Sequence, residues 1–138
     1  MKKIIVFAMM LAFVAVSCSK EQKTVNKLEG SWKATSAKVS FLGLELEVPV
    51  ESENIVYTFH ECKVKNGSCS GTSNWDGVID DFNYTIGGEG TTIETLDSNG
   101  QVQVLNIVEL EKETFKVDMD LGLDTTASNA LVTFSRQN

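Results

Sequence analysis

Hydrophobic and polar residues alternate along most of the chain after residue 27, and this pattern predicts β-strands. The clearest alternations place Phe115, Val117 and Met119 on one face of a strand, and Val132 and Phe134 on one face of the next. A period of two residues is typical of strands with one buried face. No stretch of useful length in this part of the chain has a helical period, so we expect an all-β domain.

The alternations are short, about ten residues apart, and separated by turn residues. The expected strands cover residues 32–41, 42–50, 54–63, 68–70, 81–86, 91–96, 101–110, 115–121 and 131–136. The inward face of the first is ambiguous, and a change of phase after Val104 suggests a bulge in the strand 101–110. Residues 71–77 are interpreted as an irregular loop that caps a barrel mouth. Eight or nine such strands favour an up-and-down antiparallel β-barrel, with a two-sheet sandwich as the alternative.

The first seventeen residues differ in kind from the rest. Lys2 and Lys3 precede a run of thirteen apolar residues, Ile4 to Val16, which suits a signal peptide and is too short for a membrane-spanning helix. Residues 19–27 are mostly polar, and we interpret them as a flexible tether. The expected organisation is therefore a leader at 1–17, a tether at 18–27 and one domain at 28–138.

The end of the leader, Ala15-Val16-Ser17-Cys18, resembles the lipobox of Gram-negative bacterial lipoproteins. The resemblance implies cleavage before Cys18, acylation of that residue and attachment to a membrane. Ser19 after the cysteine is similar to lipoproteins sent to the outer membrane. Lys20-Glu21 partly resembles a surface-export signal, so both the periplasmic face and the cell surface stay open.

Two motifs at opposite ends of the domain resemble those of lipocalin-like barrels. Leu28 followed by Gly30-Ser31-Trp32 is similar to the G-x-W signature of their first strand, and Arg136 matches a basic residue on their last strand. The resemblance implies that Trp32 closes the floor of the barrel and that Arg136 stacks on it and joins the first strand to the last. It also makes a small hydrophobic molecule the natural ligand.

Cys62 and Cys69 remain once Cys18 is lipidated, in a compartment that permits disulfides. A two-residue turn at Asn66-Gly67 would leave these cysteines diagonal to each other. A four-residue turn, Val64 to Gly67, would place them opposite and close enough to bond. We favour the disulfide, which would cross-link the two strands of one hairpin.

Charge and the remaining motifs exclude several functions. Acidic residues outnumber basic ones by 19 to 12, which argues against a nucleic-acid partner. The acidic series from Asp118 to Asp124 departs from a calcium loop, since its glycine is one place early. His60 is the single histidine and lacks a catalytic or metal-binding context. We expect no enzyme activity, no metal and no cofactor.

Function is then expected from the interior or the surface of the barrel. The candidate lining residues share the inward face of the expected strands: Leu44, Leu46, Tyr57, Phe59, Phe82, Tyr84, Ile93, Val104, Phe115, Val117, Met119, Val132 and Phe134. They could line a ligand cavity or form a packed core. The alternatives are a protein-interaction module, a protease inhibitor that inserts residues 19–27 into an enzyme, and a structural envelope component with a protein partner.

Overall fold

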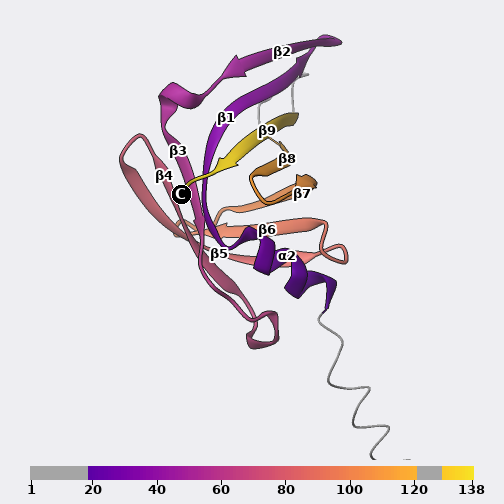
Figure 1. Ribbon diagram of the computed structural model, residues 1–138. Coiled ribbons are helices and arrows are strands. Elements are labelled where there is room, and N and C mark those ends of the chain that lie inside the picture. Colours follow the sequence, from indigo (N-terminus) through magenta and orange to yellow (C-terminus); the bar gives the residue numbers. More distant parts are fainter. Residues whose placement is uncertain (1–18, 121–128) are drawn as a thin grey trace, which may run out of the picture.

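The computed structural model describes residues 19–120 and 129–138, whose strands form one antiparallel sheet closed into a barrel (Figure 1). The strands are β1 (Gly30–Phe41), β2 (Leu44–Pro49), β3 (Ile55–Phe59), β4 (Cys69–Trp75), β5 (Val78–Gly87), β6 (Thr92–Asp97), β7 (Val102–Leu110), β8 (Thr114–Asp120) and β9 (Asn129–Arg136). The helical elements are α2 (Lys20–Leu28), η1 (Glu51–Glu53) and η2 (Val64–Asn66). Neighbouring strands follow chain order from β3 to β9, and β1 closes the barrel against β9. The predicted all-β barrel is confirmed, and the two-sheet alternative is wrong.

Strand β1 organises the closure because it pairs with three strands. Its first half lies against β3, its second half against β2, and its other edge against β9. A bulge between Ala34 and Ser36 shifts the register with β9. Trp32 and Ala34 are buried before the bulge, and Ala37 and Val39 pack on the core after it. This shift explains why the inward face of the strand is ambiguous in the sequence.

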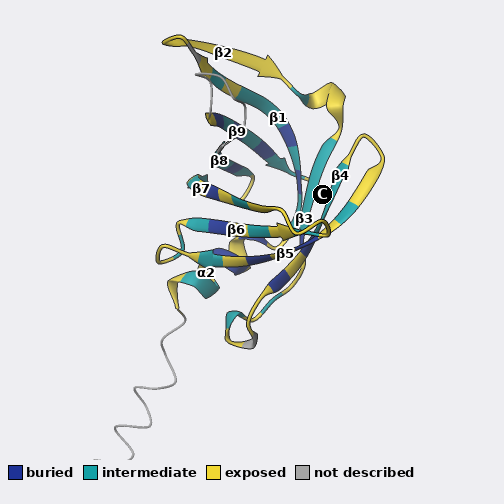
Figure 2. Ribbon diagram, turned by 180° about the vertical axis from the view of Figure 1, so that it is seen from behind, coloured by how far each residue is buried: buried dark blue, intermediate teal, exposed yellow. Residues whose placement is uncertain are grey.

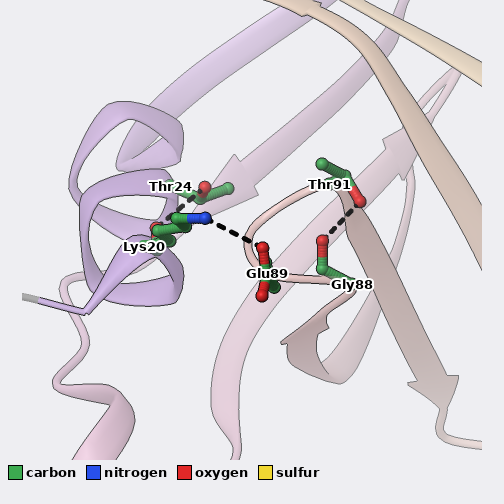
Figure 3. A network of polar contacts seen from close by, with 5 residues as sticks. All are labelled: Lys20, Thr24, Gly88, Glu89 and Thr91. Atoms are coloured by element: carbon green, nitrogen blue, oxygen red, sulfur yellow. Dashed lines mark hydrogen bonds and ion pairs between the residues drawn. The ribbon is translucent and has the colours of Figure 1, made fainter.

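The segment 19–27 is not a tether, because it forms helix α2 against one end of the barrel. Ser19 caps the helix by accepting a hydrogen bond from the Gln22 backbone N–H, and Thr24, Val25 and Leu28 are buried. Figure 3 shows the helix beside the β5–β6 turn, where Lys20 pairs with Glu89 at 2.8 Å. Thr24 donates a hydrogen bond to the Gly90 carbonyl at 2.9 Å. We call this end of the barrel the closed end.

The carboxyl end of α2 is held by the two residues that join the first and last strands. Trp32 Nε1 donates to the Leu28 carbonyl at 2.8 Å. Arg136 lies 4.2 Å over the Trp32 ring and donates to the carbonyls of Lys27 and Glu29. A cation is favourable at a helix carboxyl end, where carbonyls lack helical partners. Helix α2, the Trp32 ring and the β1–β9 pairing that closes the barrel therefore form one unit.

Buried residues concentrate toward the closed end, whereas β2 and the β4–β5 turn at the open end are exposed (Figure 2). The fully buried rings belong to Trp32, Phe59, Tyr84 and Phe115. Phe115 contacts the rings of Trp32, Phe59 and Phe134, with centroids 5.4 to 6.2 Å apart. This aromatic cluster fills the closed half of the barrel.

Three expected lining residues are outside the core. Leu44, Leu46 and Val104 have exposed fractions of 67%, 54% and 47%. The two leucines lie on β2, which extends beyond the closed part of the barrel. Val104 points outward because the bulge of β7 lies between Ile107 and Glu109 and not after Val104, so Gln103 and Leu105 take the inward positions.

Two expected boundaries between strand and loop are also wrong. Residues 71–75 belong to β4 and pair with β5 up to a short turn at Asp76 and Gly77. A Cβ atom at Gly71 would lie 2.5 Å from the Phe82 ring, so the aromatic side chain of the neighbouring strand fills the space above this glycine. Strand β3 ends at Phe59, and residues 60–68 form a longer loop that contains η2.

Candidate functional site

The open end of the barrel contains a cavity of about 490 Å³. It lies between β3, β4, β5, β6 and β7, above the aromatic cluster. Its lining residues are Tyr57, Ser73, Trp75, Val78, Asp80, Phe82, Thr95, Asp97, Gln101, Val102 and Gln103. We call it the mouth cavity. Small-molecule sites commonly have volumes of about 300 to 1,000 Å³, so this space suits one small ligand.

Aromatic rings form the floor and part of the rim of the mouth cavity. The Tyr57 ring lies 5.9 Å from that of Phe82 and 6.5 Å from that of Trp75. Burial raises the pKa of the Tyr57 hydroxyl, and a hydrogen bond from the Trp75 side chain opposes this in part. Tyr57 is therefore neutral at ordinary pH, and it lines the cavity together with Phe82 and Trp75.

Two carboxylates line the mouth cavity beside the aromatic rings, since Asp97 is the cross-strand partner of Phe82 and Asp80 lies two residues before Phe82 on β5. Asp97 accepts hydrogen bonds from the backbone N–H groups of Asn99 (2.9 Å) and Gln101 (2.8 Å), which fixes the β6–β7 turn. Asp80 on β5 accepts a hydrogen bond from the Ser98 hydroxyl of the same turn. The cavity thus combines aromatic rings inclined to one another with carboxylate hydrogen-bond acceptors.

Charge is distributed unevenly between the two ends of the barrel. The acidic residues of β2, η1 and the open-end turns are Glu45, Glu47, Glu51, Glu53, Asp76, Asp80 and Asp97, and Lys38 is the basic residue that lies with them on the β1–β2 hairpin. At the closed end, lysines of α2 and of the loop 60–68 offset the glutamates there. The open end therefore attracts cations.

The predicted lining residues fall into three groups. Tyr57 and Phe82 line the mouth cavity. Phe59, Tyr84, Ile93, Phe115, Val117, Val132 and Phe134 are buried in the core, and Met119 packs against it. Leu44, Leu46 and Val104 are exposed.

The residues of the mouth cavity that sequence reasoning missed are Ser73, Trp75, Val78, Asp80, Thr95, Asp97, Gln101, Val102 and Gln103. Asp80 is two residues from Phe82, and Thr95 is two residues from Ile93, so both continue the inward series of their strands. Hydrophobic periodicity does not reveal these residues, because it assigns only apolar side chains to the inward face.

The sulfur atoms of Cys62 and Cys69 lie at disulfide distance, with 5.6 Å between the Cα atoms. The bond fixes the loop 60–68 beside helix α2. The Gln22 amide donates to the Cys62 carbonyl at 3.0 Å and accepts from the Val64 backbone N–H at 2.9 Å. The cysteine pair is thus part of the closed end.

The other sequence candidates do not join the mouth cavity. His60 is exposed, and its Nδ1 lies 3.2 Å from the Ser70 hydroxyl. Within residues 19–120 and 129–138, no group of three histidine, cysteine or acidic side chains is placed to hold a metal ion. In the same ranges, no helix has the length and hydropathy to cross a membrane. Cys18 lies outside the described residues, as do Gly122 and Asp124.

Comparisons with known proteins support the fold. No family model and no curated protein matches this chain. A solved structure described as a redesigned beta barrel is similar over 88% of this chain and 99% of its own, with a TM-score of 0.52 and 13% sequence identity. At this identity the similarity concerns the barrel fold alone.

Proposed function

We propose that this protein is a lipocalin-like lipoprotein of the bacterial outer membrane that binds a small organic molecule in its mouth cavity. The observation that carries the proposal is the mouth cavity itself, where the rings of Tyr57, Phe82 and Trp75 lie next to the carboxylates of Asp80 and Asp97. A ligand with an apolar body and a cationic or hydrogen-bond-donating group fits both kinds of lining side chain. The role is binding without catalysis.

The position of helix α2 supports an arrangement relative to the membrane. The helix begins at Lys20, directly after its cap Ser19, and packs on the closed end. An acyl anchor on Cys18 would therefore hold the closed end at the bilayer and direct the mouth cavity away from it. The packing of residues 19–27 against the barrel favours this proposal over the protease-inhibitor alternative, which needs that segment free.

Two dyes of opposite charge test the proposed ligand class. The full chain is titrated with the cationic dye auramine O and the anionic dye 1-anilinonaphthalene-8-sulfonate, and their fluorescence is measured. We expect auramine O to bind at least about tenfold more tightly than the anion. Equal affinities would show that the carboxylates of Asp80 and Asp97 do not select ligands by their charge.

A pair of variants locates the dye. Thr95 lines the mouth cavity, whereas Thr85 is exposed on the outside of β5. Thr95→Trp should fill the cavity and weaken auramine O binding at least about tenfold, and Thr85→Trp should bind as the wild type does. If Thr95→Trp also bound like the wild type, the cavity would not be the site and the proposal would be wrong.

A further inference from the structure

Strand β2 has one free edge. Its neighbour in the sheet is β1, and no other strand among residues 19–120 and 129–138 pairs with it. The strand leaves the closed part of the barrel and extends past the mouth (Figure 1). A free edge presents backbone donors and acceptors that another extended chain can use.

The hairpin geometry identifies the backbone groups on this edge. Leu42 and Gly43 form a two-residue turn in which both φ angles are positive, +50° and +77°, as in a type I′ turn. The flanking pair, Phe41 and Leu44, is then hydrogen-bonded, and such pairs alternate along the hairpin. Glu45 and Glu47 occupy the intervening positions, so their N–H and C=O groups point away from β1.

Pro49 agrees with this assignment. It belongs to the same series as Glu45 and Glu47, so its missing N–H would also have faced the free edge. Proline is found at such positions on edge strands because it removes no hydrogen bond from the sheet.

The side chains of β2 divide by face. Leu44, Leu46 and Val48 have exposed fractions of 67%, 54% and 45%. They lie opposite Phe41, Val39 and Ala37, and cross-strand partners share a face of the sheet. Because Val39 and Ala37 pack against the core, the exposed apolar row of β2 lies on the inner face of the sheet. Of the features that protect edge strands, β2 has a proline and outward charged side chains, but it has neither an inward charge nor a bulge that would block its apolar face.

The other face of β2 carries Glu45 and Glu47, and Glu51 and Glu53 follow in η1. Lys38 lies opposite Glu47 and is the one basic partner on that face among the described residues. A second copy of this chain would bring two glutamate rows together, which like-charge repulsion disfavours. A strand with apolar residues on one face and basic residues on the other matches both rows.

We propose that the free edge of β2 docks an extended segment of a partner protein in which apolar residues alternate with lysine or arginine. The segment adds as a further strand, pairing with the backbone of Glu45 and Glu47. Its apolar side chains extend the row of Leu44, Leu46 and Val48. Its basic side chains lie beside the glutamates.

Peptides of eight residues test the docking. The full chain is titrated with fluorescein-labelled peptides of alternating lysine and valine, and of alternating glutamate and valine, and anisotropy is measured. The basic peptide should bind at least about tenfold more tightly than the acidic one. N-methylation of the peptide groups that face β2 should abolish binding, and hydrogen exchange should slow at the amides of Glu45 and Glu47. Retained binding by the methylated peptide would overturn strand addition, because that result indicates charge attraction alone.

Charge-reversal variants locate the binding surface. Glu45→Lys with Glu47→Lys should reverse the preference between the two peptides. The matched control, Glu111→Lys with Glu113→Lys, makes the same change of charge in the β7–β8 turn at the closed end and should preserve it. If the Glu45→Lys, Glu47→Lys variant still preferred the basic peptide, the proposal would be contradicted. It would also be contradicted if the chain dimerised without peptide and the Glu45 and Glu47 amides of that dimer were already protected from hydrogen exchange. Thr95→Trp, which fills the mouth cavity, should bind the basic peptide as the wild type does. Peptide binding at β2 would therefore be observed even if the mouth cavity were not a ligand site.

Discussion

A Cβ atom on Gly30 would lie 2.6 Å from Nη1 of Arg136, at a residue whose φ is +118°. Glycine is therefore required at position 30 both for its backbone conformation and for the space that it leaves. The guanidinium of Arg136 occupies that space, stacks on Trp32 and donates to the carbonyls of Lys27 and Glu29. The spacing of Gly30 and Trp32 thus has a direct cause, since the Arg136 side chain passes over Gly30 to stack on Trp32.

We predict that Gly30→Ala destabilises the fold by about 2 to 4 kcal/mol, because it adds steric conflict with Arg136 to an unfavourable φ. Gly100→Ala is the control. Gly100 also has a positive φ, +80°, but a Cβ atom there would have no neighbouring atom within 4 Å. It should lose only about 1 kcal/mol. Urea unfolding of both variants measures the difference, and equal losses would show that the space at position 30 is unimportant.

Trp32→Ala should cost about 3 to 5 kcal/mol, since it removes a fully buried ring, its contact with Arg136 and its hydrogen bond to Leu28. Trp32 lies at the closed end and does not line the mouth cavity. The folded variant should therefore bind auramine O as the wild type does. An unchanged melting temperature would contradict the assignment of Trp32 as the floor of the barrel.

Gln22→Ala should detach helix α2 from the loop 60–68. The amide of Gln22 bonds both to the Cys62 carbonyl and to the Val64 N–H, so its removal should cost about 1 to 2 kcal/mol. Lys23→Ala, on an exposed position of the same helix, is the control. Hydrogen exchange at the Val64 amide should accelerate in Gln22→Ala alone. Equal exchange in both variants would mean that other contacts hold the loop.

The closure of the barrel was predictable because both ends of the domain carry recognisable residues, Gly30 with Trp32 and Arg136. Helix α2 was missed because only Thr24, Val25 and Leu28 of its nine residues are buried, too few to produce a visible helical period. One signal was available. Ser19 and Gln22 have the spacing of a capping box, and the Ser19 side chain accepts from the Gln22 N–H.

The mouth cavity could not be derived from hydrophobic periodicity. On β7 the apolar residue Val104 is exposed and does not line the cavity, while Gln103 takes an inward position. Near an open mouth, inward side chains meet solvent and can be polar. The bulge after Ile107 then changes the phase of the strand, and a shift of one residue moves every side chain to the opposite face. Pattern alone does not locate such a shift.

Tyr84 provides a test of the closed half of the core. Its side chain is 1% exposed, and no hydrogen-bond partner for its hydroxyl lies among the described residues. Because a buried hydroxyl without a partner is costly, Tyr84→Phe should leave stability unchanged or increase it by up to about 2 kcal/mol. Tyr57→Phe is the control and should destabilise, since it removes the hydrogen bond with Trp75. A loss in Tyr84→Phe as large as in Tyr57→Phe would indicate that the Tyr84 hydroxyl is bonded.

The pH dependence of stability tests the same residue. Burial, assisted by the nearby Glu29 carboxylate, raises the pKa of Tyr84 to about 12, from 10.0 for an unperturbed tyrosine. Below pH 10 the hydroxyl is protonated in both the folded and the unfolded chain. Above about pH 10 the unfolded chain loses this proton more readily, so the stabilisation declines as pH rises toward the folded pKa. Urea midpoints of the wild type should therefore fall more steeply between about pH 10 and 12 than those of Tyr84→Phe. The contribution of Tyr57 is common to both proteins and cancels in the comparison, and parallel curves would contradict a neutral, buried Tyr84.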